Sequence, residues 1–463
     1  MTKLDGGRTP TTTKPRPRLA RGQASLRLVP AGSWVALLVT WLIWIINAFD
    51  REVILRLGPI ISQNFGLSPE AWGIITAVIF FALAVMAIPG SRMSDRHGTG
   101  WKRAWFQVPL VIGYNLLSAI SGVRAVAGNL VAFLLLRVGV NLGAGWGEPV
   151  GVSNTTEWWP KERRGFALGV HHTGYPVGAL LSGLVAAWML GAFGVENWSY
   201  IFFVGLIAAI PVMAFWWWYS RKHRLDRVYT SITERGMTPP ISAEESSTHH
   251  EDQKGAIRAC LTNKIVMLTS GTTLLFQIVY NGVSYILPLY LANIVGLPFA
   301  DAAAYSVVFT ITGILGQIVW PSISDYLGRR KTLIITGVWM GISAGAFYFA
   351  HSMGAYIGVQ LLLGCVANAP WPIFYAAATD AAPRNIAGTA NGFITTSMFL
   401  GGGLAPLIIG ALIAVGGGWA NIFGYNISFI VMMVSAIVGV ILQVIVREPR
   451  MSFDTLEPSH PTS

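Results

Sequence analysis

Charged side chains inside long apolar stretches are the residues of this sequence best suited to chemistry. Asp50 and Arg51 lie in one such stretch and Glu148 in another, in a 463-residue chain of which only 11% is charged. Hydrocarbon tolerates ionised groups only where they pair or face a water-filled path. The pKa of a carboxyl group depends on its burial and on nearby cations, so Asp50 or Glu148 could exchange a proton. An anion at Arg51 would compete for the cation that keeps a neighbouring carboxylate ionised, which links anion binding to proton binding.

The composition places these residues in a membrane. Hydrophobic residues make up 53% of the chain and occur in blocks rather than in amphipathic alternation. The net charge of +11 is concentrated in short segments between the blocks, a pattern of membrane topology rather than of nucleic-acid binding. The two cysteines, Cys260 and Cys365, form no CxxC and no metal-ligand spacing, so neither a disulfide nor a metal site is predicted. No cofactor is expected.

Twelve stretches of about 20 apolar residues predict twelve transmembrane helices, because backbone groups in lipid must be satisfied within the helix. They cover residues 34–57, 71–91, 104–122, 128–153, 165–190, 198–219, 264–291, 301–323, 331–350, 354–378, 388–415 and 421–446. The predicted fold is an all-α polytopic membrane protein in two six-helix halves, 34–219 and 264–446, joined by a polar cytoplasmic loop at 220–263. Residues 1–33 are predicted to form a basic disordered cytoplasmic tail, and residues 447–463 a second cytoplasmic tail.

The connections between these helices predict their orientation. Alternate connections are rich in Lys and Arg, which by the positive-inside rule places them, the central loop and both termini in the cytoplasm. Two of the basic connections share a motif in which Asp is followed three residues later by Gly and then by bases. We expect this motif to form tight turns at helix ends that control conformation, and its candidate residues are Asp95, Arg96 and Gly98 in the first half and Asp325, Gly328, Arg329 and Arg330 in the second.

Two six-helix halves with this loop motif resemble the major facilitator superfamily. Closer motifs resemble its anion:cation symporter family: Asp50-Arg51, Glu148-Pro149, Trp158-Trp159-Pro160, the run from Tyr280 to Leu291, and Gly401-Gly402-Gly403 with Pro406. The resemblance implies a carrier whose halves rock around a central cavity, with Asp50 and Glu148 coupling protons to the movement of an organic anion. Sugar acids and aromatic carboxylates are the implied substrates, and the sequence does not choose between them.

Helix four departs from the family pattern at one position. Relatives commonly have an arginine two turns before the glutamate, where this chain has Asn141, and the nearest base is Arg137. At about 100° per residue, both positions lie within roughly 20° of the Glu148 face. Either Arg137 replaces the missing cation, or the site has one cation fewer.

The remaining candidate substrate-binding residues are polar or aromatic positions in apolar helices. A stripe in helix seven could line a cavity or could hydrogen-bond to neighbouring helices, and weaker candidates lie in helices ten and eleven. With Arg51, Arg137 and Asn141, the candidates are Gln277, Tyr280, Asn281, Tyr285, Trp371, Tyr375 and Asn391. His171 and His172 could relay protons or donate to an anion, although an interfacial position bonded to backbone or water is favoured.

The sequence therefore predicts a secondary transporter that imports an organic anion with protons, as a monomer in the plasma membrane, with the bacterial inner membrane favoured. A proton-linked exporter or exchanger of the same fold is the main alternative. A membrane-embedded enzyme is disfavoured because the sequence has no zinc-type cluster, no G-x-S-x-G and no P-loop. A sensor that binds the ligand without moving it stays open, as does sodium in place of protons.

Overall fold

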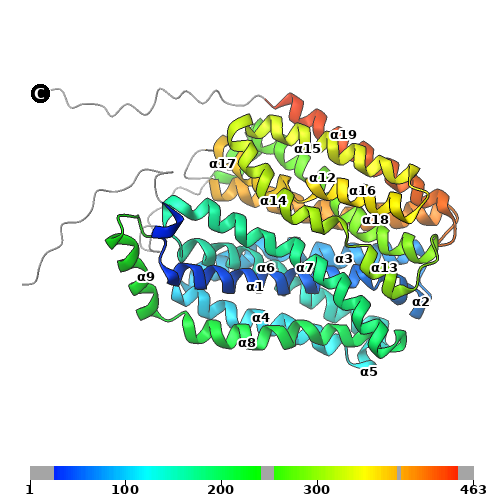
Figure 1. Cartoon of the computed structure of the whole chain (residues 1–463), viewed down its shortest axis with the longest axis horizontal. Coiled ribbons are helices and arrows are strands. Elements are labelled where there is room, and N and C mark those ends of the chain that lie inside the picture. The colour runs from blue at the N-terminus through cyan, green and yellow to red at the C-terminus, as the bar shows by residue number, and fades with distance from the viewer. Residues whose placement is uncertain (1–24, 241–254, 383–386, 447–463) are drawn as a thin grey trace, which may run out of the picture.

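The computed structural model describes residues 25–240, 255–382 and 387–446, and all regular secondary structure among them is helical. Twelve segments of the described chain are long and apolar enough to cross a membrane, which confirms the predicted number of spans and the all-α fold class. Residues 1–24, 241–254, 383–386 and 447–463 lie outside the described residues, so most of the first predicted tail, the second tail and the middle of the central loop are not described. In the part of the first tail that is described, Leu26–Leu28 form a 3₁₀ turn and a helix starts at Ala31. Helices of the first half lie along one side of the molecule and those of the second half along the other (Figure 1).

The helices fall into two groups in chain order. The first group consists of α1 (Ala31–Arg56), α2 (Gly58–Asn64), α3 (Pro69–His97), α4 (Trp101–Ser121), α5 (Arg124–Ala127), α6 (Leu130–Glu157), α7 (Arg164–Phe193) and α8 (Phe203–Tyr219), with 3₁₀ turns η1 (Leu26–Leu28), η2 (Lys161–Arg163) and η3 (Val195–Phe202). Two helices, α9 (Lys222–Glu234) and α11 (Ala256–Thr262), belong to the central segment. The second group consists of α12 (Lys264–Asn293), α13 (Phe299–Tyr305), α14 (Phe309–Leu327), α15 (Arg329–Ala346), η5 (Phe347–Phe349), α16 (Met353–Ala367), α17 (Pro370–Ala381), α18 (Ala387–Val415) and α19 (Ile422–Ile445).

Two of the predicted continuous helices are interrupted. The stretch predicted at 301–323 consists of α13 and α14, separated by a turn at 306–308. The stretch predicted at 354–378 consists of α16 and α17, which starts at Pro370. Proline has no backbone N–H and its ring clashes with the preceding turn, so it favours the first position of a new helix. This second break places Trp371 and Tyr375 on a separate short helix.

The two halves meet closely at one end of the bundle. We call the end where α1 begins and α19 finishes the tail end, and the other the opposite end; they lie at the left and right of Figure 1. At the opposite end, the Trp419 indole N–H donates to the Leu67 carbonyl at 2.9 Å. A Cβ on Gly73 would lie 2.6 Å from the Pro406 carbonyl oxygen, and one on Gly183 would lie 2.6 Å from that of Ala303. Glycine at these two positions therefore allows the halves to pack backbone against backbone.

The central segment packs on the first half at the tail end. Helix α9 buries Leu225, Val228 and Ile232, which lie three and four residues apart on one face. Next to it, the Thr238 backbone N–H donates to the Glu162 carboxylate at 2.9 Å. Part of the predicted polar loop is thus an amphipathic helix joined to the first half.

Candidate functional site

A small cavity lies between the two halves. Its lining residues come from α1, α6 and α7 of the first half and from α12, α14, α17 and α18 of the second: Trp44, Arg51, Glu148, His172, Tyr175, Gln277, Tyr280, Gln317, Trp371, Tyr375 and Met398. Six of the predicted candidates, Arg51, Glu148, Gln277, Tyr280, Trp371 and Tyr375, are among them. The two halves thus build one site from residues far apart in the sequence.

One ion pair faces this cavity. The Arg51 guanidinium on α1 lies 3.4 Å from the Glu148 carboxylate on α6, and both side chains are at least nine-tenths buried. The rings of Tyr175 and Phe399 lie 5.2 and 5.4 Å from the guanidinium carbon, within cation–π range. Arg51 lines the cavity, so its guanidinium can donate to an anion that enters it.

Consecutive charged residues on α1 point to three different surroundings. Each residue of an α-helix is rotated by about 100° from the one before it. Asp50 accordingly faces α4 and α6, Arg51 faces the cavity, and Glu52 faces α7. The predicted neighbours Asp50 and Arg51 thus belong to separate clusters, each with a partner on another helix.

Asp50 lies in a polar cluster inside the first half. Its Oδ1 accepts a hydrogen bond from the Ser118 hydroxyl at 2.9 Å. Arg137 donates to the same hydroxyl at 3.3 Å and to the Asp50 carbonyl at 3.4 Å, and its guanidinium lies 4.6 Å from the Phe202 ring. Asp50 and Arg137 are fully buried. Arg137 therefore lies with Asp50, and not with Glu148, which is eleven residues and about 16 Å further along α6.

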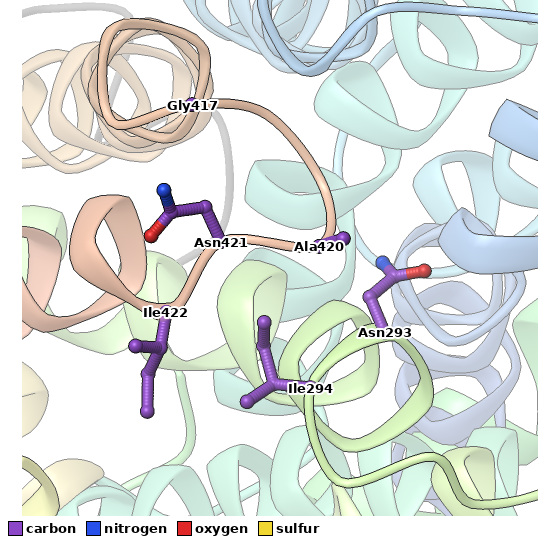
Figure 2. A pocket seen from close by; sticks show the side chains of 6 residues that line it. All are labelled: Asn293, Ile294, Gly417, Ala420, Asn421 and Ile422. Atoms are coloured by element: carbon purple, nitrogen blue, oxygen red, sulfur yellow. The ribbon is translucent and has the colours of Figure 1, made fainter.

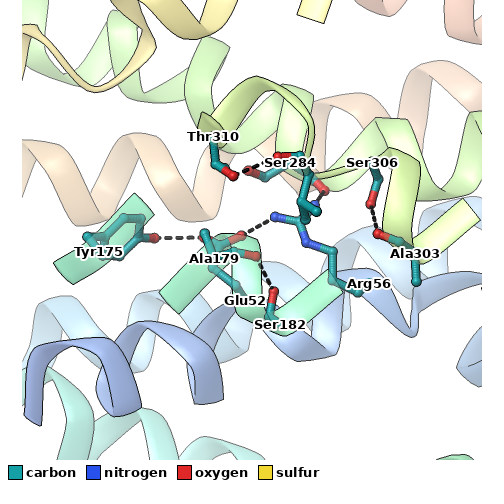
Figure 3. Close-up of polar contacts among 10 residues, drawn as sticks. Glu52, Arg56, Tyr175, Ala179, Ser182, Ser284, Ala303, Ser306 and Thr310 are labelled. Atoms are coloured by element: carbon teal, nitrogen blue, oxygen red, sulfur yellow. Dashed lines mark hydrogen bonds and ion pairs between the residues drawn. The ribbon is translucent and has the colours of Figure 1, made fainter. Parts of the chain in front are cut away.

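A second ion pair of α1 lies towards the opposite end. The Arg56 and Glu52 side chains are 2.5 Å apart, one helical turn from each other, and neither is exposed. Arg56 also donates to the Ser284 carbonyl of α12 at 2.9 Å, and the Tyr175 hydroxyl donates to Glu52 at 2.7 Å. Figure 3 shows this chain of contacts from Tyr175 through Glu52 and Arg56 to Ser284. It joins a residue of the cavity wall to a contact between the two halves.

Four predicted substrate-binding residues lie outside the cavity lining in addition to Arg137. The Asn141 amide donates to the Arg137 carbonyl one turn earlier in α6. Asn281 lies close to Gly402 of α18, and Tyr285 is buried. Asn391 accepts from the Thr379 hydroxyl at 3.2 Å. On α12 it is therefore Gln277 and Tyr280, three residues apart, that face the cavity, and the roles of the other four stay predictions.

The two histidines have different surroundings. His171 is buried, lies 3.1 Å from the Thr155 hydroxyl through Nδ1 and stacks on Trp44 at 5.6 Å. His172 lines the cavity, and its Nδ1 lies 2.7 Å from the Leu168 carbonyl oxygen. Both residues lie about two turns inside α7, and an interfacial position for them stays a prediction.

The repeated loop motif forms the expected helix ends. Gly98 follows α3 with φ of +106° and Gly328 follows α14 with φ of +89°, conformations that favour glycine. In the second half, Arg329 pairs with Asp325 at 2.6 Å and with Asp380 of α17 at 3.6 Å. Arg330 donates to the Gln443 and Val444 carbonyls near the end of α19. The side chains of Asp95 and Arg96 lie outside the described residues, and a conformational role for the motif remains a prediction.

An open depression at the opposite end was not expected from the sequence. Figure 2 shows it between the end of α12 and the turn before α19, and its lining residues, Asn293, Ile294, Gly417, Ala420, Asn421 and Ile422, are uncharged. The Asn421 side chain caps α19, and the Asn293 amide donates to the Tyr425 hydroxyl. Because its polar groups serve the local structure, the central cavity is the better candidate site.

Sequence reasoning missed several residues of the site and its surroundings. Glu52 and Arg56 meet the criterion that identified Asp50, namely a charge within an apolar stretch, and their spacing of four residues predicts a pair. No comparable signal exists for Trp44, Tyr175 or Gln317, because aromatic and amide residues are common in apolar helices. Only the packing of helices shows that they reach the cavity.

Comparison with known proteins agrees with this architecture. The sequence matches the Major Facilitator Superfamily over residues 40–325 and 269–461. It is 23% identical to a cis,cis-muconate transport protein of Acinetobacter baylyi (89% of this chain, 94% of the relative) and 22% identical to a hexuronate transporter of Escherichia coli (94% and 98%). It is 24% identical to a gallate transporter of Pseudomonas putida (74% and 77%).

Solved structures show the same fold. The xylose transporter of E. coli, in a partially occluded inward-open conformation, superposes with a TM-score of 0.70 at 15% identity, covering 90% of this chain and 98% of that one. A bacterial homologue of the human lysosomal transporter Spinster, inward-facing and occupied, gives a TM-score of 0.68 at 19% identity, covering 89% and 96%.

Proposed function

Because the chain belongs to the Major Facilitator Superfamily, whose members are transporters rather than enzymes, we propose that it imports an organic anion together with protons by alternating access. Arg51 binds the carboxylate of the anion, and Glu148 takes up the proton. Asp50 is a second proton-coupling carboxylate, which lies behind the cavity wall and is positioned by Ser118. No cofactor is needed for this function.

The Arg51–Glu148 pair is the observation that carries the proposal. Its two groups lie on different helices, face the cavity and are 3.4 Å apart, which is long for a charge-assisted hydrogen bond. A carboxylate ligand that bonds to Arg51 therefore replaces part of what holds Glu148 ionised, and Glu148 becomes easier to protonate. The reverse holds by linkage, so that a protonated Glu148 favours the anion.

The relatives support the substrate class. Those described above are named for muconate, hexuronates and gallate, all of which are carboxylates. A guanidinium beside aromatic side chains suits such compounds, because it can bind a carboxylate in a bidentate manner while Tyr175, Trp371 or Tyr375 packs against the body of the anion.

The orientation follows from the charge of the connections. The basic connections lie at the tail end, which we therefore place in the cytoplasm together with both termini and the central segment. The halves pack closely at the opposite end, so in this assignment the site is closed towards the outside. The two six-helix halves, 34–219 and 264–446, move as the rocking units. One chain supplies both cavity walls, so a monomer in a plasma membrane, such as a bacterial inner membrane, is sufficient.

Uptake into proteoliposomes tests the proposal. A library of carboxylates is supplied outside vesicles that contain the full-length protein, with and without an acidic outer bath and in sodium-free buffer. Acidification is expected to increase accumulation, and Glu148→Gln is expected to remove that increase while exchange of labelled for unlabelled substrate continues. Accumulation that requires sodium or ATP, or that stays equally sensitive to pH in Glu148→Gln, would contradict the proposal.

A further inference from the structure

We infer that the cavity is built for an organic anion with a single carboxylate, and that a second carboxylate on the same molecule is selected against. This inference rests on the proposed function, because it concerns the substrate of the same cavity. It comes from the distribution of charge over the two walls of the cavity. Membership of the family does not fix the number of carboxylates, since the names of the relatives include both mono- and dicarboxylates.

The wall from the first half supplies one fixed positive charge. Among the described lining residues, Arg51 is the only arginine or lysine and Glu148 the only acid. The pair has no net charge while Glu148 is ionised and a charge of +1 once Glu148 is protonated. One proton at Glu148 therefore balances one carboxylate at Arg51, and a dianion would leave an uncompensated negative charge in the cavity.

The neighbouring guanidinium groups are engaged elsewhere. Arg137 lies behind the wall against Ser118, the Asp50 backbone and the Phe202 ring. Arg56 bonds to Glu52 and to the Ser284 carbonyl, and its side chain has no exposed surface. Neither belongs to the cavity lining, so neither is placed to bind a second carboxylate there.

His172 in its neutral form does not supply a second cation for an anion in the cavity. Its Nδ1 lies 2.7 Å from the Leu168 carbonyl oxygen, and since a carbonyl can only accept, Nδ1 must carry the hydrogen. In the neutral ring the other nitrogen, Nε2, is then an acceptor. A carboxylate is also only an acceptor, so the two repel unless the ring takes up a second proton.

The wall from the second half is neutral throughout. It consists of the amides Gln277 and Gln317, the phenols Tyr280 and Tyr375, and the apolar or aromatic surfaces of Trp371 and Met398. Gln277 and Gln317 are more than nine-tenths buried, and the amide oxygen of each has no hydrogen-bond partner among the described residues. Amides and phenols both donate and accept hydrogen bonds, so this wall suits the hydroxyl groups or ring of a monoacid but has no charge to balance a second carboxylate.

A matched pair of ligands separates charge from size. D-gluconate and D-glucarate have the same carbon chain and differ in one terminal CH₂OH or carboxylate; monomethyl terephthalate and terephthalate differ in one methyl ester. Binding of each to the full-length protein is measured by thermal stabilisation at pH 7.5, and uptake is measured in proteoliposomes. Where a pair binds, we expect the monoacid to have an apparent Kd at least about tenfold lower than the diacid, which corresponds to about 1.4 kcal/mol.

A variant of the neutral wall provides the second test. Gln317→Arg places a cation opposite Arg51 and should shift the ratio of apparent Kd values toward the diacid by about tenfold, whereas the uncharged control Gln317→Met should not shift it. A wild-type protein that binds the diacid as tightly as the monoacid would overturn the inference and leave the proposed function intact. A protein that binds and transports no carboxylate in a wider library would overturn both.

Discussion

Helix α1 contributes to two buried ion pairs that differ in their distance, their partners and their place in the molecule. Arg51–Glu148 joins two helices across 3.4 Å and faces the cavity. Glu52–Arg56 lies within one helix at 2.5 Å, has no exposed surface and is completed by Tyr175 and by the Ser284 carbonyl. The first pair faces a cavity that a ligand can enter, whereas the second pair links the two halves towards the opposite end.

This difference separates two kinds of buried charge. An ion pair that is loose and faces a cavity can change partners during a cycle, because a substrate can replace one of its members. A pair that is closely bonded to its surroundings stabilises one conformation, because either charge left alone in the interior is costly. Tyr175 touches both, since it lines the cavity and donates to Glu52.

The largest effect is expected at the closely bonded pair. Arg56→Met leaves the Glu52 carboxylate buried without its cation and should destabilise the protein by about 3–5 kcal/mol, measured by chemical denaturation or thermal unfolding in detergent. The double variant Glu52→Gln/Arg56→Met removes both charges and should recover most of that loss. A single variant as stable as the wild type would show that the pair does not hold this end together.

A loss of binding rather than of stability is expected at the cavity pair. Arg51→Gln removes the cation that anchors the carboxylate and should weaken substrate binding by about 2–5 kcal/mol, with a much smaller change in unfolding temperature than Arg56→Met causes. Isothermal titration with a transported acid measures the first quantity and thermal unfolding the second. Equal loss of stability in both variants would remove the distinction between the pairs.

An intermediate effect is expected at Tyr175, which contacts both ion pairs. Tyr175→Phe removes the hydroxyl that donates to Glu52 and should cost about 1.5–3 kcal/mol of stability, the usual range for a hydrogen bond to a charged group. The ring is retained, so its cation–π contact with Arg51 and the binding of substrate should change little. A variant with normal stability and strongly reduced binding would show that the hydroxyl takes part in substrate binding and not in holding the two halves together.

The smallest effect on transport is expected behind the cavity wall. Ser118→Ala removes the hydroxyl that bonds to the Asp50 carboxylate and to the Arg137 guanidinium and should destabilise the protein by about 1.5–3 kcal/mol, the usual range for a hydrogen bond to a charged group. Transport should retain its dependence on the pH gradient if Ser118 serves only to position Asp50. Ser118→Thr, which keeps the hydroxyl, is the matched control.

The sequence predicted the helical architecture well because the bilayer imposes it. Apolar stretches of spanning length and basic connections are local signals, and they identified all twelve spans. Two features were missed for want of a different search of the same sequence. The break before Pro370 and the amphipathic face of Leu225, Val228 and Ile232 were readable in the sequence but lay outside a search for long apolar stretches.

The site was predictable only in part, for a geometric reason. Charges in apolar helices stand out, so Arg51 and Glu148 were found, yet the rotation of α1 decides which neighbour each charge meets. Asp50 and Arg51 are adjacent in sequence and lie in separate clusters, while Arg137 joins Asp50 and not Glu148. Partners on other helices depend on tertiary packing, which no spacing along one helix determines.

The most direct test of the account is the proton movement that the substrate itself causes. Proteoliposomes with no imposed pH gradient and with a pH-sensitive dye inside are given an external carboxylate in sodium-free buffer, with potassium and valinomycin to prevent a build-up of voltage. We predict that the interior acidifies as the acid enters, and that Glu148→Gln abolishes the acidification while exchange of the labelled acid continues. Entry of the labelled acid into wild-type vesicles with no change in internal pH would contradict the account.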